Sequence, residues 1–421
     1  MRLPFAAAVL LALSGCYPWT PPALSPVTQP AGPATGAAAR SAPAAARAPV
    51  TILVSIDGFR PDYLRQGNTP TLDRLARDGV SAAMRPVFPT MTFPNHYSMV
   101  TGLWPGRHGI INNTMLDPAR PGVVFRTADS AQVRDGFWWD GAEPLWVSAE
   151  RAGIRTGTMF WPGSEAEIRG LRPSAWVPYA AQIDASRRVD FVLDWLRRPL
   201  GDRPGFLTLY FDTIDKTSHN AGYDSPDKLA AIRESDAGVA RLLAGLAALG
   251  QPANLIVVSD HGMAAVPADH LIDVQDMVRN PALTVLAEGP QLSVFVKSGG
   301  EDPAARLAQL PHAKCWPRAT IPTRFRLADS PRAPDWLCLA DGYWRFVGEP
   351  PRAYVKGEHG FDPADPAMAA LFIAVGPAFG SQRRIASFDN VDLYPLLRRL
   401  IGLPPVSGTD ASDALSNKVL R

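Results

Sequence analysis

Three continuous apolar segments, far apart along the chain, each lead into an aspartate. The segments ILVSI, FLTLYFDTI and LIVVS are followed by Asp57, Asp215 and Asp260. Apolar runs of this length are typical of strands buried on both faces of a sheet. Polar residues at the carboxyl ends of such strands lie where ligand sites of open α/β sheets form. The chain is therefore expected to bring three carboxylates together at one rim of a sheet.

Amphipathic segments alternate with these apolar runs. Leucines and valines at helical spacing predict helices over residues 68–80, 186–198 and 227–249, and further segments predict a helix over 144–153 and a strand over 154–160. An alternation of strands and helices is the pattern of parallel βα units. The sequence thus predicts an α/β fold with a mostly parallel central sheet and helices on both faces.

The alternation of strands and helices changes over the segment from about residue 290 to residue 355. Short strand-like runs such as LSVFVK and YWRFV occur there among many prolines, together with Cys315 and Cys338. This segment is interpreted as a small α+β cap inserted into the main domain. The main sheet is expected to resume with ALFIAVG after His359, and a helix over 390–401 is expected to follow. With 421 residues, of which 46% are hydrophobic, the chain can bury one large core, and we expect a single domain over 50–421.

Histidines accompany two of the three aspartates. His219 follows Asp215 by four residues, His261 follows Asp260 directly, and His359 lies in the segment GEHGFD. A set of carboxylates and imidazoles suits two divalent cations of the zinc type, and manganese is also compatible. Two such cations can hold the attacking and leaving oxygens of a displacement at phosphorus.

The segment PVFPTMTFPNHYSMVTGL supplies a candidate nucleophile, Thr92. A threonine hydroxyl needs a base, a cation or a metal to react. Thr90 is an alternative on chemical grounds alone. A helix is expected to start after Thr92, and its free N–H groups can bind phosphate oxygens. The Asn113 amide can donate a further hydrogen bond, whereas His96 and His108 are expected to make structural hydrogen bonds.

The beginning of the chain has the layout of an export signal. MRLPFAAAVLLALSGC combines one arginine, a short apolar run and small residues before Cys16. LSGC resembles the bacterial lipobox, which implies a signal peptide over 1–16, lipidation of Cys16, and a periplasmic or outer-membrane location. The alternative is an ordinary cleaved signal. Residues 17–49 are rich in proline and alanine and are interpreted as a disordered tether.

In an exported chain, Cys315 and Cys338 are expected to form a disulfide, and two buried thiols are the alternative. The formal net charge of +2 favours neither a nucleic-acid polymer nor an acidic polymer as a partner, while a small anionic substrate remains compatible with a local cationic site. The sequence leaves the oligomeric state open.

Six motifs occur in order between residues 56 and 362: IDGFRPDYL, PTMTFPNHYSMVTGLWPGRHGIINN, WPGSE, DKTSH, SDHGM and GEHGFD. Together they resemble the nucleotide pyrophosphatase/phosphodiesterase (type I phosphodiesterase) branch of the alkaline phosphatase superfamily. The resemblance implies an alkaline phosphatase-like core and two zinc ions per chain. It assigns one zinc to Asp215, His219 and His359, and the other to Asp57, Asp260, His261 and the Thr92 hydroxyl.

The resemblance also implies the reaction and the substrate pocket. Thr92 attacks phosphorus to give a phosphothreonine-type intermediate, and Asn113 and the Thr92 N–H bind the non-bridging oxygens. Phe93 and Tyr210 match positions that sandwich the nucleotide base in relatives, and Trp161 matches a nearby loop; packing in the core is the alternative for these aromatics. Ser218 stands where relatives usually carry glycine, but the spacing from aspartate to histidine is intact.

The leading hypothesis is an exported phosphoric diester hydrolase that acts on nucleotide phosphodiesters or pyrophosphates. The same machinery acting on another diester, such as a choline phospholipid, is the alternative. A phosphomonoesterase is less favoured because no motif supplies an arginine clamp or a third metal. A sulfatase is disfavoured because that family needs a cysteine or serine that is converted to formylglycine, whereas this chain has Thr92 with no cysteine nearby. An inactive binding module is the remaining hypothesis.

Overall fold

A computed structural model describes residues 47–348 and 355–421, so the expected signal peptide with Cys16, and nearly all of the expected tether, lie outside the described residues. The strand β1 (Val50–Ile56) lies at the centre of the main sheet between β7 (Phe206–Phe211) and β8 (Ala253–Val258). Both neighbours run parallel to β1. The three apolar runs are therefore adjacent strands, and their carboxyl ends lie at the same edge.

The described part of the chain contributes nine strands to this sheet, in the order β18-β2-β17-β8-β1-β7-β5-β6, with β19 also paired to β2. The remaining strands are β2 (Val80–Arg85), β5 (Thr156–Met159), β6 (Ala175–Val177), β17 (Ala370–Val375), β18 (Arg383–Arg384) and β19 (Phe388–Asp389). β17 is antiparallel to both β2 and β8, whereas the other pairings are parallel. The mostly parallel sheet is confirmed, with one antiparallel strand within it.

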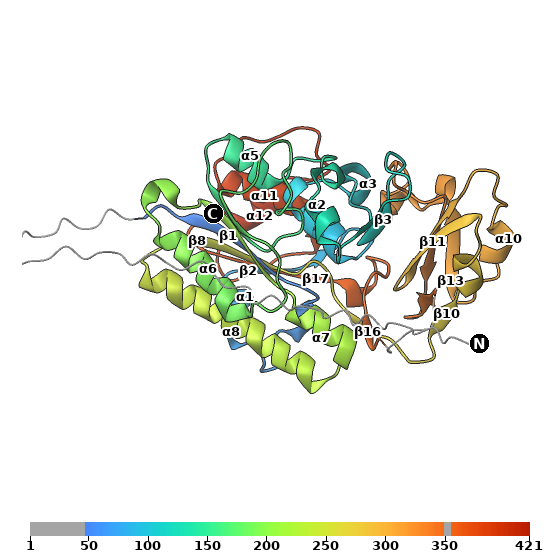
Figure 1. The fold of residues 1–421 in the computed structure, drawn as a ribbon. Helices are drawn as coiled ribbons and strands as arrows, with labels where there is room; N and C mark the ends of the chain where they lie inside the picture. The colour runs from blue at the N-terminus through green and yellow to red at the C-terminus, as the bar shows by residue number, and fades with distance from the viewer. Residues whose placement is uncertain (1–46, 349–354) are drawn as a thin grey trace, which may run out of the picture. The chain divides into compact units, whose positions relative to one another are not determined.

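Helices cover both faces of the sheet (Figure 1). One face carries α1 (Pro70–Asp78), α6 (Ala185–Arg197), α7 (Thr213–Ala221) and α8 (Pro226–Ala248). The other carries α2 (Thr92–Thr101), α5 (Leu145–Arg151), α11 (Leu393–Leu400) and α12 (Ala414–Val419). Side chains of β1 alternate between the two cores, since Leu53 packs with the second set of helices, and Ile52 and Val54 pack with the first. Burial on both faces explains why this strand is a continuous apolar run.

One apolar run ends earlier than the sequence suggests. The strand before Asp215 stops at Phe211, and Asp212 precedes the first turn of α7. Asp215 and His219 therefore lie one helical turn apart on α7, a spacing that puts both side chains on one face of the helix. Ser218 lies between them, but its hydroxyl donates to the carbonyl of Ile214 in the same helix at 2.7 Å.

The inserted segment forms a separate antiparallel sheet, ordered β11-β12-β14-β13. Its strands are β11 (Leu283–Glu288), β12 (Gln291–Val296), β14 (Trp336–Ala340) and β13 (Ala313–Pro317). A further pair, β10 (Leu271–Asp273) and β15 (Arg345–Val347), shares its core, so the insertion starts at β10 rather than near residue 290. Cys315 and Cys338 are opposite each other in the β13–β14 pair and form a disulfide with a Cα–Cα distance of 4.0 Å.

The remaining helices and strands of the described residues are short. The helices are α3 (Pro105–His108), α4 (Ser130–Val133), α9 (Gln275–Val278) and α10 (Ala304–Leu307), and the strands are β3 (Thr114–Leu116), β4 (Val124–Arg126), β9 (Ala264–Ala265) and β16 (Gly357–Glu358). The 3-10 turns are Pro61–Tyr63, Gly136–Trp138, Leu200–Asp202, Arg318–Thr320, Thr323–Phe325, Pro366–Met368 and Asn390–Asp392. Within 47–348 and 355–421, no helix combines the length and apolarity that a membrane span requires.

Candidate active site

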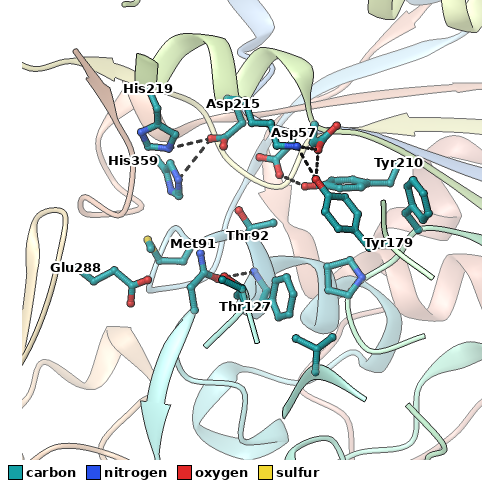
Figure 2. Close-up of a pocket in the computed structure, with 18 of the residues that line it drawn as sticks. Asp57, Met91, Thr92, Thr127, Tyr179, Tyr210, Asp215, His219, Glu288 and His359 are labelled. Atoms are coloured by element: carbon teal, nitrogen blue, oxygen red, sulfur yellow. Dashed lines mark hydrogen bonds and ion pairs between the residues drawn. The ribbon is translucent and has the colours of Figure 1, made fainter. Parts of the chain in front are cut away.

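The three aspartates that follow β1, β7 and β8 meet at the carboxyl edge of the sheet. Asp57 directly follows β1, and Asp215 comes from the first turn of α7 (Figure 2). Asp260 follows β8. Gly58 makes this approach possible. Its φ is +69°, and a Cβ atom there would lie 3.3 Å from the Cα of Asp215. A larger residue would therefore be strained and would crowd the start of α7.

Asp215 forms a compact group with two histidines. Its Oδ1 atom lies 3.3 Å from Nε2 of His219 and 3.5 Å from Nε2 of His359 (Figure 2). One ligand atom from each of the three residues lies within 4.8 Å of the others. The group therefore has the composition and spacing of a metal site, and its members are those assigned to one zinc by the resemblance.

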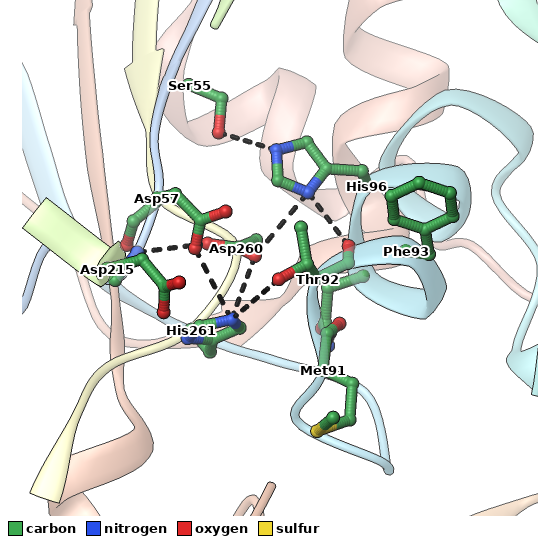
Figure 3. A network of polar contacts seen from close by, with 12 residues as sticks. Ser55, Asp57, Met91, Thr92, Phe93, His96, Asp215, Asp260 and His261 are labelled. Atoms are coloured by element: carbon green, nitrogen blue, oxygen red, sulfur yellow. Dashed lines mark hydrogen bonds and ion pairs between the residues drawn. The ribbon is translucent and has the colours of Figure 1, made fainter. Parts of the chain in front are cut away.

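A second group surrounds His261 (Figure 3). Its Nε2 atom lies 3.5 Å from Oδ1 of Asp57 and 3.0 Å from Oδ2 of Asp260. Ligand atoms of Asp57, His261 and, again, Asp215 lie within 4.8 Å of one another. Asp215 therefore belongs to both groups. Asp260 lies beside the second group, where its Oδ1 accepts a bond of 3.3 Å from the N–H of Gly58.

The three histidines of these groups are oriented alike. Their Nδ1 atoms contact backbone carbonyls, at 2.7 Å from His219 to Gly357, 2.9 Å from His261 to Gly262, and 2.8 Å from His359 to Thr90. When Nδ1 carries the proton and donates a hydrogen bond to the carbonyl, the Nε2 lone pair faces the same space as the carboxylate oxygens, where both can coordinate a cation. Such backbone partners are typical of metal-ligating histidines because they fix the tautomer and the ring orientation.

The carboxylates of the site are buried close together. Burial raises the pKa of Asp57 well above its usual value, and the charges of Asp260 and Asp215 raise it further. Although burial opposes the charged form, Asp215 raises the pKa of His219 to about 10. Three buried oxygens, Oδ1 of Asp57, Oδ1 of Asp215 and Oδ2 of Asp260, have only the histidine nitrogens nearby and no hydrogen-bond donor of good geometry among the described residues. Buried anionic oxygens without donors are costly unless a cation compensates them, so the site fits divalent metal ions.

Thr92 is the first residue of α2, and its hydroxyl faces this cluster (Figure 3). Its Oγ1 atom lies 3.4 Å from Nε2 of His261. The hydroxyl of Thr90 is instead buried and donates to the carbonyl of Phe361 at 2.8 Å. Of the two threonines, Thr92 therefore has the reactive position.

Asn113 lies against the first turn of α2. Its Oδ1 atom accepts a hydrogen bond of 3.0 Å from the N–H of Phe93. The side-chain NH₂ group is then left to donate into the cavity that both residues line. The Thr92 N–H belongs to the first helical turn, whose N–H groups have no partner within the helix. These two donors can bind the oxygens of a phosphoryl group held over the Thr92 hydroxyl.

Two histidines of the α2 segment support it. His96 is buried; its Nε2 lies 2.8 Å from the Ser55 hydroxyl, and its Nδ1 lies 2.8 Å from the Thr92 carbonyl and 3.5 Å from Asp260. His108 contacts the Ser98 hydroxyl at 2.9 Å. Both therefore make the structural hydrogen bonds expected of them.

A chain of hydrogen bonds links Asn113 to the loop of His359. The Asn113 N–H donates to Oδ1 of Asn112 at 2.8 Å, and Nδ2 of Asn112 donates to Oε1 of Gln291 at 3.1 Å. Nε2 of Gln291 then donates to the Gly360 carbonyl at 2.8 Å. Gln291 is buried and belongs to the insertion. Sequence reasoning missed it because no local pattern indicates a contact with segments so distant in the chain.

A cavity of about 770 Å³ opens over the site. Phe93, Phe160, Trp161, Tyr179 and Tyr210 line it, together with Asp57, Asp215, His219 and His359. Tyr210 is 7% exposed and its hydroxyl donates to Asp57, so it serves the carboxylate cluster more than the open cavity. Trp161 is buried and donates to the His96 carbonyl at 3.2 Å.

Tyr179 is the aromatic residue that sequence reasoning missed. It is 42% exposed, and its ring borders the cavity (Figure 2). Its hydroxyl donates to Asp212 and accepts a bond of 2.6 Å from Lys216. Tyr179 stands alone in the polar segment after β6, so only its exposure beside the cavity distinguishes it from other surface tyrosines.

Comparisons with known proteins place the chain among its relatives. The sequence profile of the type I phosphodiesterase/nucleotide pyrophosphatase family matches residues 51–362. The chain is 35% identical over 381 residues to an uncharacterised pyrophosphatase/phosphodiesterase of Schizosaccharomyces pombe, covering 85% of this chain and 78% of that protein. It is 33% identical over 374 residues to a bis(5'-adenosyl)-triphosphatase of Xenopus laevis, covering 88% of this chain and 80% of that one.

Solved structures show the same relationship. Human ectonucleotide pyrophosphatase/phosphodiesterase 5 matches with a TM-score of 0.83 at 29% identity, over 88% of this chain and 100% of that chain. An inactive threonine-to-alanine variant of the murine protein in complex with AMP matches with a TM-score of 0.83 at 30% identity, over 89% of this chain and 100% of that chain. The resemblance carried by the six motifs is thus confirmed in sequence and in fold. The chain belongs to the type I phosphodiesterase/nucleotide pyrophosphatase family.

Proposed function

We propose that this member of a family of phosphodiester and pyrophosphate hydrolases cleaves nucleotide substrates through a covalent intermediate on Thr92. The observation that carries the proposal is the position of the Thr92 hydroxyl at His261, beside buried carboxylate oxygens that lack hydrogen-bond donors of good geometry among the described residues. The inactive threonine variant of the murine structural neighbour, in complex with AMP, supports both the nucleophile and the nucleotide class.

The chemistry of the donor set supports two zinc ions, with manganese as the alternative. One would be held by Asp215, His219 and His359, and the other by Asp57 and His261 with Asp260 and the Thr92 hydroxyl nearby. Bound there, such cations polarise the phosphoryl oxygens and lower the pKa of coordinated hydroxyl groups.

The chain's own residues perform the remaining work. The Thr92 hydroxyl gives up its proton to solvent as its Oγ1 forms a bond to phosphorus, while the bond to the leaving oxygen breaks and that oxygen takes the electron pair. Asn113 Nδ2 and the Thr92 N–H bind the non-bridging oxygens, where negative charge accumulates. Water then attacks the phosphothreonine-type intermediate, releases the nucleoside monophosphate and restores Thr92.

The nucleoside would bind on the aromatic side of the cavity. Phe93 follows the nucleophile and lines the cavity, and the exposed ring of Tyr179 borders the same space. Aromatic walls stack with any base. Tyr179, rather than Tyr210, is proposed as the partner of Phe93, because the Tyr210 hydroxyl is engaged by Asp57. The buried Trp161 would form part of the wall of this side of the cavity.

A panel of purified diesters with added zinc tests the proposal. A dinucleoside polyphosphate should be hydrolysed to a nucleoside monophosphate, and glycerophosphocholine should be hydrolysed poorly. Preferential turnover of glycerophosphocholine would instead support the choline phospholipid alternative. Loss of activity with a chelator and its recovery with zinc would support the metal assignment, and absence of turnover with every diester would favour a binding module.

We also propose that the protein is exported and anchored through Cys16 in the periplasm or outer membrane. The layout of the first sixteen residues and the Cys315–Cys338 pair, which suits an oxidising compartment, support this. The Cys16→Ser variant should no longer be lipidated and should leave the membrane fraction. An unchanged membrane association would contradict lipid anchoring.

A further inference from the structure

The cavity continues past the histidines onto the insertion. Ala287, Glu288, Gly289 and Arg345 of the insertion line it together with Glu358. Figure 2 shows Glu288 and Tyr179 on opposite sides of Thr92. The cavity therefore has a second side, away from the aromatic residues at which the nucleoside is proposed to bind. Another part of the substrate can occupy this second side.

Arg345 lies beyond the Asp215 group on this side. Oε1 of Glu358 is 3.8 Å from Nδ1 of His219, and Oε2 of Glu358 is 3.6 Å from Nε of Arg345. In an in-line displacement the leaving group departs on the side opposite the nucleophile. For attack by Thr92 on a phosphorus held at the two Asp/His groups, the His219 and Arg345 side is the leaving-group side.

Among the described residues, the guanidinium of Arg345 forms an ion pair with Glu358 but no hydrogen bond. Its side chain is 15% exposed, and its Nε is buried without a hydrogen-bond partner among the described residues. The distance of 3.6 Å to Glu358 is too long for a hydrogen bond. By contrast, the buried Arg332 donates to Asp117 at 2.6 Å and to the carbonyls of Gly109 and Trp138. A guanidinium with unused donors beside a cavity is ready for an anionic ligand.

We propose that Arg345 forms a subsite for a phosphate group in the leaving group, so that the enzyme prefers pyrophosphate bonds to diesters with an uncharged leaving group. This inference rests on the proposed function and specifies its substrate class as nucleoside or dinucleoside polyphosphates. The planar guanidinium matches two phosphate oxygens, and it neutralises the charge that the departing phosphate gains when its bond to the nucleotide phosphorus breaks.

Two acids, Glu358 and Glu288, border the subsite. Glu358 faces both Arg345 and His219. Glu288 accepts bonds from the N–H and hydroxyl of Thr114 at 3.1 and 3.3 Å, and burial raises its pKa to about 7. A protonated Glu288 can donate to a phosphate oxygen instead of repelling it.

The test compares two substrates that share a nucleoside monophosphate product. One is a dinucleoside triphosphate, and the other is the p-nitrophenyl ester of a nucleoside 5'-monophosphate, whose leaving group carries no phosphate. In Arg345→Met, the ratio of kcat/KM for the triphosphate to that for the ester should fall at least about tenfold. Arg306→Met, at a cation of the same insertion paired with Asp276 on the surface, should leave the ratio unchanged.

An unchanged ratio in Arg345→Met would overturn the proposal, whether both activities persist or both decline together. If Arg345→Met does not fold, as judged by near-UV circular dichroism, Arg345→Lys decides the question. It keeps the charge but loses the planar pair of donors, so the ratio should fall about threefold. If the wild-type protein hydrolyses neither substrate, the proposed function itself fails, which is a different outcome.

Discussion

The side-chain amide of Gln291 donates a hydrogen bond of 2.8 Å to the backbone carbonyl of Gly360, which joins the insertion to the loop of His359. The same side chain accepts from Asn112, whose neighbour Asn113 contacts α2. One buried residue of the insertion thus braces both a metal-site loop and the residue expected to bind phosphoryl oxygens. The insertion therefore supports the candidate active site through at least one buried side chain.

We therefore predict that Gln291→Leu lowers kcat because both braced segments lose their hydrogen bonds, and the partners left buried cost about 1–3 kcal/mol of stability. Zinc affinity, measured by titration, should fall as well, since the His359 loop is less fixed. Gln309→Leu, at an exposed position of the same insertion, is the control and should change neither quantity. A Gln291→Leu enzyme with wild-type kcat and zinc affinity would show that the brace is dispensable.

Thr92→Ala should abolish hydrolysis, because no other described hydroxyl lies beside His261. Its metal content and melting temperature should stay close to those of the wild type. Thr90→Ala loses the bond to Phe361 and should lose about 1 kcal/mol of stability, yet it should retain much of its activity. The assay is release of nucleoside monophosphate. If Thr90→Ala were inactive and Thr92→Ala remained active, Thr90 would be the nucleophile instead.

Substitutions of the two cavity tyrosines, Tyr179 and Tyr210, should affect different kinetic constants. Tyr179→Leu removes a stacking surface, so KM should rise by about tenfold, as expected for loss of roughly 1–3 kcal/mol of stacking. Tyr210→Phe removes a donor to Asp57 and should lower kcat with a smaller effect on KM. Steady-state kinetics with a nucleotide substrate measures both. An effect of Tyr210→Phe on KM alone would return Tyr210 to the base-binding role.

Glu288 should make stability depend on pH. Burial raises its pKa from 4.5 to about 7. Between these values the folded chain holds a proton that the unfolded chain has released, so stability should fall as pH rises through this window. The contribution is at most about 3 kcal/mol. Urea unfolding at about pH 5 and about pH 7.5 should show a smaller loss in Glu288→Gln than in wild type. Equal losses in the two proteins would exclude Glu288 as the source.

The fold was largely predictable because burial on both faces produces long apolar runs. The runs before Asp57 and Asp260 are adjacent parallel strands, as expected. The direction of β17 was not predictable, because a buried strand has the same composition in either orientation. The run before Asp215 was predicted as strand throughout, but Asp212 ends the strand and the chain turns into α7.

The site was predictable where a residue is marked by its neighbours in sequence, as His219 is by Asp215. It was not predictable where function depends on exposure or on contacts between distant segments. Tyr210 lies in a strand and points its hydroxyl at Asp57, whereas Tyr179 occupies the open side of the cavity. Gln291 and Arg345 are ordinary residues of the insertion until the fold places one beneath the His359 loop and the other beside Glu358.

The stereochemistry of cleavage at phosphorus distinguishes a covalent intermediate on Thr92 from direct attack by water. A nucleoside phosphorothioate diester of defined configuration is hydrolysed in isotopically labelled water, and the configuration of the product is determined. Attack by Thr92 followed by attack of water inverts the configuration at phosphorus twice, so we expect net retention of configuration. Net inversion would show that water attacks phosphorus directly and would contradict an intermediate on Thr92.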